Sequence, residues 1–150
     1  MNLKQQIDSD LKQALLAGDK GKVTTLRGLK AAILDAEVSS GSREDGISNS
    51  EIEKIFQREA KKRRESIGLY RSNSRSDLAD AEQAELDLID AYLPKQLDEE
   101  ELVAIVNDTI SSMGGVSVKD MGRVIGAVKA KVGTSADGAF IAQVVKQKIG

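Results

Sequence analysis

The 150-residue sequence contains no cysteine, no histidine and no tryptophan, and it has a single proline. Without cysteine the chain has neither a disulfide scaffold nor a thiol nucleophile. Without histidine it lacks the commonest general base and the commonest metal ligand. These absences argue against most acid–base, nucleophilic and transition-metal chemistry. We therefore expect no catalytic residues, no cofactor and no metal site.

Long apolar runs and a strong net charge are also missing. No segment approaches the roughly 20 apolar residues that span a bilayer, and the first residues lack the apolar stretch of a signal peptide. The formal net charge is −2, so no global field draws the protein to nucleic acid or anionic lipid. We expect a cytoplasmic protein with no membrane partner, in which any attraction to a polyanion comes from a local patch.

The residues that are present are typical of helices. Hydrophobic residues make up 40% of the chain and charged residues 31%, whereas aromatic residues make up only 3%. This composition favours an all-α fold. The second helix is expected to hold Leu34 and Val38 on the same apolar side as Leu26. Apolar spacings of three and four predict helices near residues 3–18, 20–38, 48–70, 76–93, 98–113, 118–132 and 137–149.

Four of these helices begin with residues that favour a helix N-terminus. Ser48 is followed three residues later by Glu51, which is the pattern of a capping box. We also expect Ser76 and Asp137 to cap helices, where a side-chain oxygen can accept a hydrogen bond from an unpaired backbone N–H. Asp98 and the three glutamates after it place carboxylates in a first turn, where the helix dipole favours them.

Pro94 marks the best candidate boundary between domains. The residue before a proline is pushed away from helical angles, so the fourth helix is expected to end at Leu93. We predict two helical domains: a four-helix N-terminal domain over residues 1–93 and a three-helix tail domain over residues 98–150. Residues 94–97 form the predicted hinge.

Several ordered motifs resemble one known family. They lie at residues 26–32 (LRGLKAA), 61–67 (KKRRESI), 75–79 (RSDLA), 92–97 (YLPKQL), 119–126 (KDMGRVIG) and 136–138 (ADG). Together they resemble the YqeY family, which is similar to the C-terminal tail of the B subunit of the tRNA-dependent Asp/Glu amidotransferase. The resemblance implies domains of about four and three helices and a tail that contacts the tRNA body. It does not imply amidotransferase chemistry, because that lies in a large catalytic domain for which this chain has no room.

Charged residues fall within the predicted apolar faces of the second, third and fourth helices. Burying an unpaired charge in an apolar helix interface is energetically unfavourable, so we expect these charges to form ion pairs. The predicted inward polar network joins Arg27 and Arg63 to Glu59, Glu82 and Glu85. We interpret it as a set of structural salt bridges that fixes helix register. The alternative is that the three carboxylates bind a divalent cation or act as acid and base, which the two inward arginines disfavour.

The sixth predicted helix carries two glycines on its polar side. A glycine inside a helix costs about 1 kcal/mol relative to alanine, so the pair calls for a reason. Residues 109–150 include six basic and two acidic side chains, a net charge of +4. We interpret the polar side as an RNA-binding surface with cations for phosphates and glycines for close approach. An alternative is that the glycines admit a neighbouring helix. The predicted RNA-binding residues are Lys119, Gly122, Arg123, Gly126, Lys129 and Lys131.

Three functional hypotheses follow. The first is a tRNA-associated docking protein that binds a folded RNA body by phosphate and shape contacts, because so few aromatic side chains offer no platform for stacked single-stranded bases. The second is an adaptor that binds a helix of another protein in a tRNA-modifying complex. The third is a glutamine-dependent carbon–nitrogen ligase resembling the amidotransferase, which the missing cysteine, histidine and nucleotide-binding loop disfavour. The sequence leaves the oligomeric state open.

Overall fold

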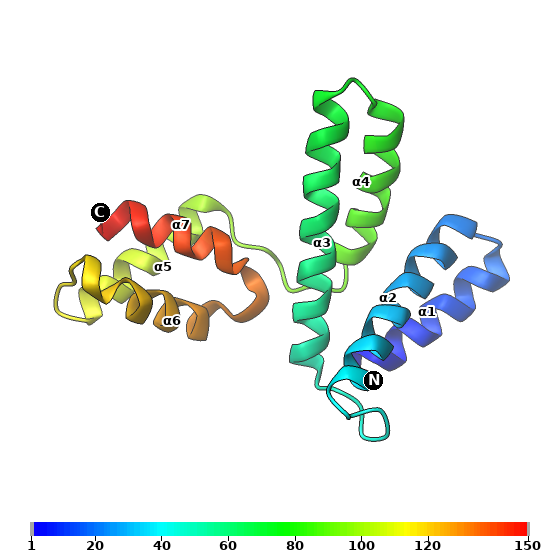
Figure 1. The fold of residues 1–150 in the computed structure, drawn as a ribbon, viewed down its shortest axis with the longest axis horizontal. Coiled ribbons are helices and arrows are strands. Elements are labelled where there is room, and N and C mark those ends of the chain that lie inside the picture. Colours follow the sequence, from blue (N-terminus) through cyan, green and yellow to red (C-terminus); the bar gives the residue numbers. More distant parts are fainter. Residues whose placement is uncertain (1, 150) are drawn as a thin grey trace. The chain divides into compact units, whose positions relative to one another are not determined.

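The computed structural model describes residues 2–149, which form seven α-helices, two short 3-10 helices and no strand (Figure 1). The all-α class predicted from the sequence is confirmed. Contacts between Cα positions group the chain into two compact units, one ending at Leu93 and the other beginning at Pro94. Independent folding of these units as domains stays a prediction.

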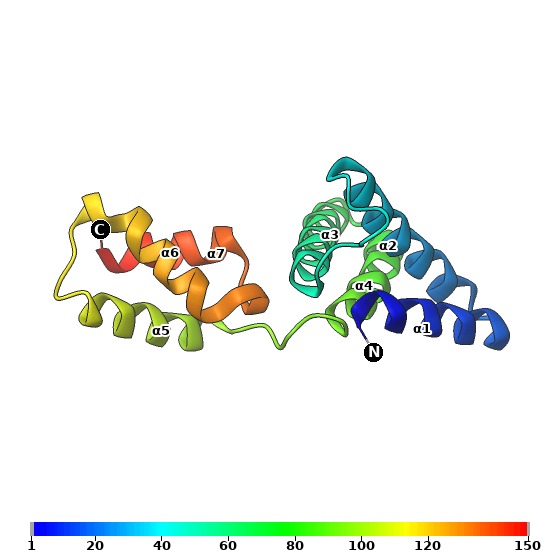
Figure 2. The same ribbon diagram turned by 90° about the horizontal axis from the view of Figure 1, so that it is seen from below.

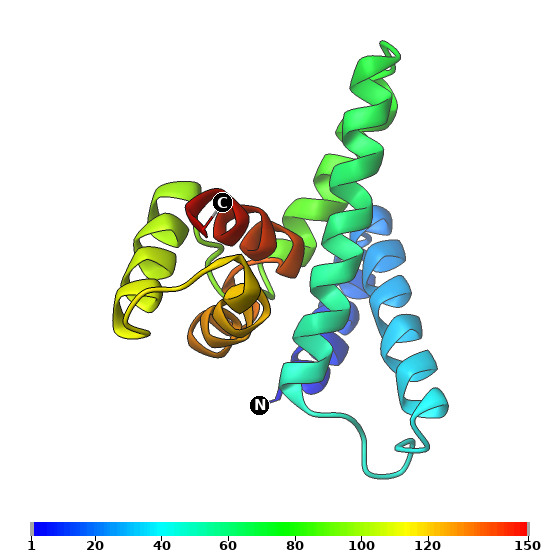
Figure 3. The same cartoon turned by 60° about the vertical axis from the view of Figure 1, so that its left-hand side comes forward.

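The first unit is built from two helical hairpins. α1 packs along α2, and α3 packs along α4 in the most extensive helix contact of the unit (Figures 1 and 3). Gly18 closes the first hairpin in the left-handed conformation, at φ 71°, and its N–H donates to the last carbonyls of α1. This conformation favours glycine. The four helices are α1 (Leu3–Ala17), α2 (Lys20–Ser39), α3 (Asn49–Ser72) and α4 (Ser76–Asp90).

The second unit is a three-helix arrangement in which each helix contacts the other two (Figure 2). Its core is almost entirely aliphatic, with valine, leucine and isoleucine side chains buried from all three helices. Such packing needs no aromatic residue, which agrees with the composition. The elements are α5 (Glu99–Ser112), the 3-10 helix η1 (Val118–Asp120), α6 (Met121–Val132), the 3-10 helix η2 (Gly133–Ser135) and α7 (Gly138–Ile149).

The helix starts agree with the sequence patterns in all but one place. The Ser48 hydroxyl accepts a hydrogen bond from the Glu51 N–H at 3.2 Å, and Asp98 caps α5 in the same way. Ser76 is instead the first residue of α4, and Arg75 holds the cap position without a side-chain hydrogen bond. The arginine side chain has no hydrogen-bond acceptor, so α4 begins without the side-chain cap that the sequence pattern predicts.

The predicted hinge at 94–97 is partly bound to the second unit. α4 ends at Asp90, three residues before the predicted end. The Gln96 side-chain amide and the Leu97 N–H then donate to two carbonyls of η2, at 3.0 and 2.8 Å. The last two residues of this segment are therefore fixed by hydrogen bonds instead of serving as a free linker.

The core of the first unit surrounds one fully buried aromatic ring. Phe56 has no exposed surface, and its ring meets that of Tyr92 edge-on at a centroid distance of 6.0 Å. The Tyr92 hydroxyl donates a hydrogen bond to Asp10 on α1. Burial, together with this hydrogen bond, raises the pKa of the Tyr92 phenol well above its ordinary value. The phenol therefore keeps its proton, and α1 stays tied to the end of α4.

Candidate nucleic-acid interface

α6 has one buried side and one exposed side. Val124, Val128 and Val132 are buried against the other helices of the second unit. At 100° per residue, Arg123 and Gly126 lie on the opposite side of the helix, Gly122 and Lys129 lie at the edges of that side, and all four are exposed. Exposed Lys119 precedes them on η1. We call these five residues, from Lys119 to Lys129, the α6 basic face.

No contact with another part of the described chain explains Gly122 and Gly126. A Cβ added at either position would meet no heavy atom within 4 Å, leaving aside the helix's own nearby backbone. Neither glycine has the positive φ that favours this residue. The alternative that they admit a neighbouring helix therefore does not hold within residues 2–149. The two glycines therefore lower the stability of the helix without making room for a neighbouring group in the described residues.

The cations of the α6 basic face are available to a ligand. Lys119, Arg123 and Lys129 make no ion pair with any acidic side chain in residues 2–149. Lys129 extends along the start of α7, where its Nζ lies 3.4 Å from a Cβ built at Gly138. An exposed cation with no intramolecular partner can neutralise a phosphate without first breaking a salt bridge.

Lys131 does not share this face. Its ammonium donates a hydrogen bond to the hydroxyl of Thr109 on α5, at 2.9 Å, and Thr109 itself is buried. This contact holds Lys131 on the side of α6 that packs against α5. We therefore separate it from the other predicted RNA-binding residues and assign it a structural role.

Replacing Gly126 by alanine should raise the free energy of unfolding of the second unit by about 0.5–1 kcal/mol, because alanine loses less backbone entropy in a helix. The space at this position is open, so no clash offsets the gain. Ala130 lies four residues later on the same exposed side and provides the matched control: Ala130→Gly should lower stability by a similar amount. Thermal denaturation followed by circular dichroism measures both. Destabilisation by Gly126→Ala would contradict an open helix face.

The predicted inward polar network forms only around Arg63. Arg63 Nε lies 3.3 Å from Glu85 Oε2, and Nη1 lies 3.9 Å from Glu59 Oε1, so the guanidinium links α3 to α4. Arg27 is exposed, and neither it nor Glu82 forms an ion pair within residues 2–149. In the same part of the chain no three acidic side chains are grouped to hold a metal ion.

The most buried charge in the first unit lay outside the predicted network. The Glu37 side chain is only 2% exposed, and both of its oxygens accept hydrogen bonds from Lys4 Nζ at 3.0 Å. The two residues are 33 positions apart, so the pair joins the start of α1 to the end of α2. The apolar neighbours of Glu37 in the sequence indicated burial, but helical spacing could not identify a partner from another helix.

Comparison with known proteins gives a match over nearly the whole chain. A family model described as "Yqey-like protein" matches residues 4–149. The relatives that match the chain include three with the name "Altered inheritance of mitochondria protein 41, mitochondrial". The one from Eremothecium gossypii is 39% identical over 87 residues, which cover 58% of this chain and 46% of that protein. The one from Vanderwaltozyma polyspora is 32% identical over 122 residues, covering 77% and 64%. The one from Pyrenophora tritici-repentis is 26% identical over 150 residues, covering 97% and 80%.

These relatives contradict the expectation of a cytoplasmic protein, because each is named as a mitochondrial protein. The prediction of a cytoplasmic location is therefore wrong. It rested on a missing signal peptide and a missing membrane span, and neither absence distinguishes the cytoplasm from an organelle. Residues 2–149 contain no helix with the length and apolar character needed to cross a bilayer. The chain spans about half to two thirds of the length of the first two relatives.

Proposed function

We propose that this chain, which belongs to the YqeY family, docks onto a folded RNA of the tRNA type through the α6 basic face. One observation carries the proposal. Two helix glycines with no neighbour lie among three exposed cations with no ion-pair partner in residues 2–149. A bare stretch of helix backbone flanked by cations suits a ligand that is itself a charged backbone.

The glycines act by letting the phosphate backbone approach the helix. Without Cβ atoms at Gly122 and Gly126, a ribose–phosphate chain comes closer to the helix axis than it would over larger side chains. At that distance the flexible side chains of Lys119, Arg123 and Lys129 reach phosphates on either side. This close approach of the RNA backbone accounts for two glycines that otherwise only lower the stability of the helix.

A folded RNA suits this surface better than a single strand. The chain has two Phe and two Tyr residues, and Phe56 and Tyr92 pack against each other in the first unit. Stacking of successive unpaired bases requires aromatic platforms, whereas the backbone of a helical RNA is read through phosphates, 2′-hydroxyls and shape. The similarity of the YqeY family to the amidotransferase tail, which contacts the tRNA body, supports the same target. The names of the relatives make mitochondrial tRNA the first RNA to test.

Replacing both Lys119 and Arg123 by alanine should weaken binding to folded tRNA and reduce its dependence on salt. Each phosphate contact that is lost makes the slope of log K against log salt less negative by about one. The slope of the double variant should therefore be less negative than that of the wild type by about two. Fluorescence anisotropy with labelled tRNA over a series of salt concentrations measures this slope. Both side chains are exposed, so the variant should keep its thermal stability.

Lys131→Ala is the control for loss of charge, because it removes one positive charge from α6 outside the α6 basic face. Its ammonium is bound to Thr109 on α5, so we expect a nearly unchanged slope and a small loss of stability. An unchanged slope in the Lys119 and Arg123 double variant would exclude this face as the site of RNA binding. Salt-insensitive binding to a protein, lost in Gly126→Leu and kept in Lys119→Ala, would favour the adaptor hypothesis.

A further inference from the structure

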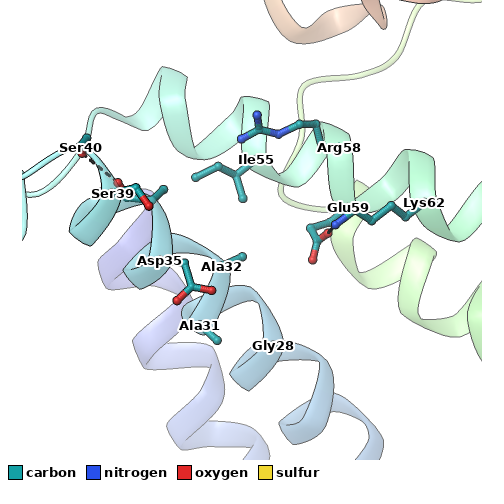
Figure 4. A pocket seen from close by; sticks show the side chains of 11 residues that line it. Gly28, Ala31, Ala32, Asp35, Ser39, Ser40, Ile55, Arg58, Glu59 and Lys62 are labelled. Atoms are coloured by element: carbon teal, nitrogen blue, oxygen red, sulfur yellow. Dashed lines mark hydrogen bonds and ion pairs between the residues drawn. The ribbon is translucent and has the colours of Figure 1, made fainter.

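The first unit contains a groove that the proposed function does not use. It lies between α2 and α3 and has a volume of about 720 Å³ (Figure 4). The wall formed by α3 carries larger side chains, among them Ile55, Arg58 and Lys62. The wall formed by α2 is lined mainly by small side chains, which leave room for a helix to lie against it. These residues of α2 are Gly28, Ala31, Ala32, Ala36 and Ser39.

An exposed apolar row runs along α2 beside this groove. Ala31, Leu34 and Val38 are spaced by three and four residues, so they lie on one side of the helix. Leu34 is 44% exposed and Val38 is 57% exposed. Ala31 also lines the groove, which makes the apolar row continuous with the small-residue wall. Large aliphatic side chains exposed beside an open groove indicate a surface that another helix covers.

The charges of the groove indicate which kind of occupant fits. Asp35 projects from α2 and Arg58 belongs to α3, and neither has an ion-pair partner in residues 2–149 (Figure 4). Glu59 is already paired with Lys62 at 3.1 Å. A free carboxylate near the negative end of the α2 dipole repels a polyanion such as RNA. A polypeptide that brings one acid and one base is complementary to both walls.

We propose that the occupant is a second copy of this chain, so that α2 of each copy lies in the groove of the other. In a twofold-symmetric interface, if one residue meets another then the reciprocal contact also forms. In the proposed arrangement Asp35 of one copy pairs with Arg58 of the second copy, and by symmetry the same pair forms again on the other side of the axis. The two unpaired charges of a single chain satisfy each other in the dimer.

The shape of α2 fits both roles that this arrangement requires. Its small side chains open the groove in their own copy, and the same side chains allow the helix to enter the groove of the second copy. Gly28 meets no neighbour within 4 Å, so two α2 helices can cross closely there. α2 has 20 residues and is about 30 Å long. The groove is lined by residues 28–40 on one side and by residues 55–62 on the other, so the C-terminal half of α2 makes the contact.

Sedimentation velocity over a concentration series, without RNA, tests the proposal. The wild-type chain should dimerise, and the single variants Asp35→Arg and Arg58→Asp should each self-associate at least about tenfold more weakly, because each places like charges opposite one another. An equimolar mixture of the two variants should recover the wild-type affinity as a heterodimer, because every pair is then opposite in charge. Asp35→Arg also improves the charge at the C-terminal end of α2, so unfolding does not explain its weaker association.

Asp80→Arg and Arg71→Asp are the matched controls. Both residues are exposed on α4 and α3 and lie outside the groove lining, so both variants should dimerise as the wild type does. A wild-type chain that stays monomeric at its highest soluble concentration would overturn the proposal. So would single variants that still dimerise, or a mixture that stays monomeric. Each of these results leaves the RNA proposal intact, because the measurement contains no RNA and uses no residue of the α6 basic face.

Discussion

Replacing Phe56 by alanine should lower the free energy of unfolding of the first unit by about 3–5 kcal/mol. The ring is completely buried, so the change removes its transfer free energy and leaves a cavity between α3 and its neighbours. It also removes the edge-on contact with Tyr92 at 6.0 Å, which adds about 0.5–1.5 kcal/mol in comparable pairs. Urea denaturation followed by circular dichroism measures the loss.

Phe56→Leu is the conservative control, because it keeps most of the apolar volume and should cost clearly less than alanine. The same pair of variants tests whether the two units fold independently. Hydrogen exchange should show lost protection in α1–α4 of the alanine variant and unchanged protection in α5–α7. A loss below about 1 kcal/mol would contradict the central position of the ring. Equal loss of protection in both units would contradict separate domains.

Replacing Lys4 by methionine should destabilise the first unit by about 2–3 kcal/mol, because it leaves the buried Glu37 carboxylate without its partner. Removing one member of a fully buried pair costs about 3–5 kcal/mol. Lys4 itself is 45% exposed, so water can partly replace it, which places the expected value below that range. Chemical denaturation of the wild type and the variant gives the difference directly.

Two further variants separate the buried charge from the loss of a lysine. Lys30→Met breaks an exposed ion pair in which Lys30 Nζ lies 2.6 Å from Asp8 Oδ1. It should lower the free energy of unfolding by less than about 1 kcal/mol. Adding Glu37→Leu to Lys4→Met should recover stability, because no unpaired charge is then left in the interior. If Lys4→Met proves no more harmful than Lys30→Met, the Glu37 pair does not stabilise the fold as its burial suggests.

The helices of this protein could be predicted because their signals are local. Apolar spacing, capping residues and glycine stops depend on a few neighbouring positions, and they located all seven helices. The sequence-based prediction placed too many residues on the buried side of α2, because Leu34 and Val38 are exposed. At 100° per residue, Leu34 and Val38 lie about 80° and 120° from buried Leu26, and only a narrow stripe of α2 packs against the other helices. The width of that stripe depends on how the neighbouring helices are placed.

The candidate site was predictable to the extent that it lies on one helix. Gly122, Arg123, Gly126 and Lys129 all belong to α6, so their place away from the centre of its buried side follows from helical geometry, whereas Lys119 lies on η1. The same geometry places Lys131 about 140° from Gly126, and the sequence-based grouping overlooked this. Pairs between helices could not be predicted. The contact between Glu37 and Lys4 arises only when α1 packs on α2, and Arg27 falls outside the Arg63 network for the same reason.

Binding of the full-length chain to folded tRNA at two salt concentrations tests the central claim most directly. Three phosphate contacts, from Lys119, Arg123 and Lys129, predict binding at low salt and a slope of log K against log salt of about −3. Saturable binding with that slope is the result we expect. Absence of binding at low salt would contradict RNA docking through the α6 basic face.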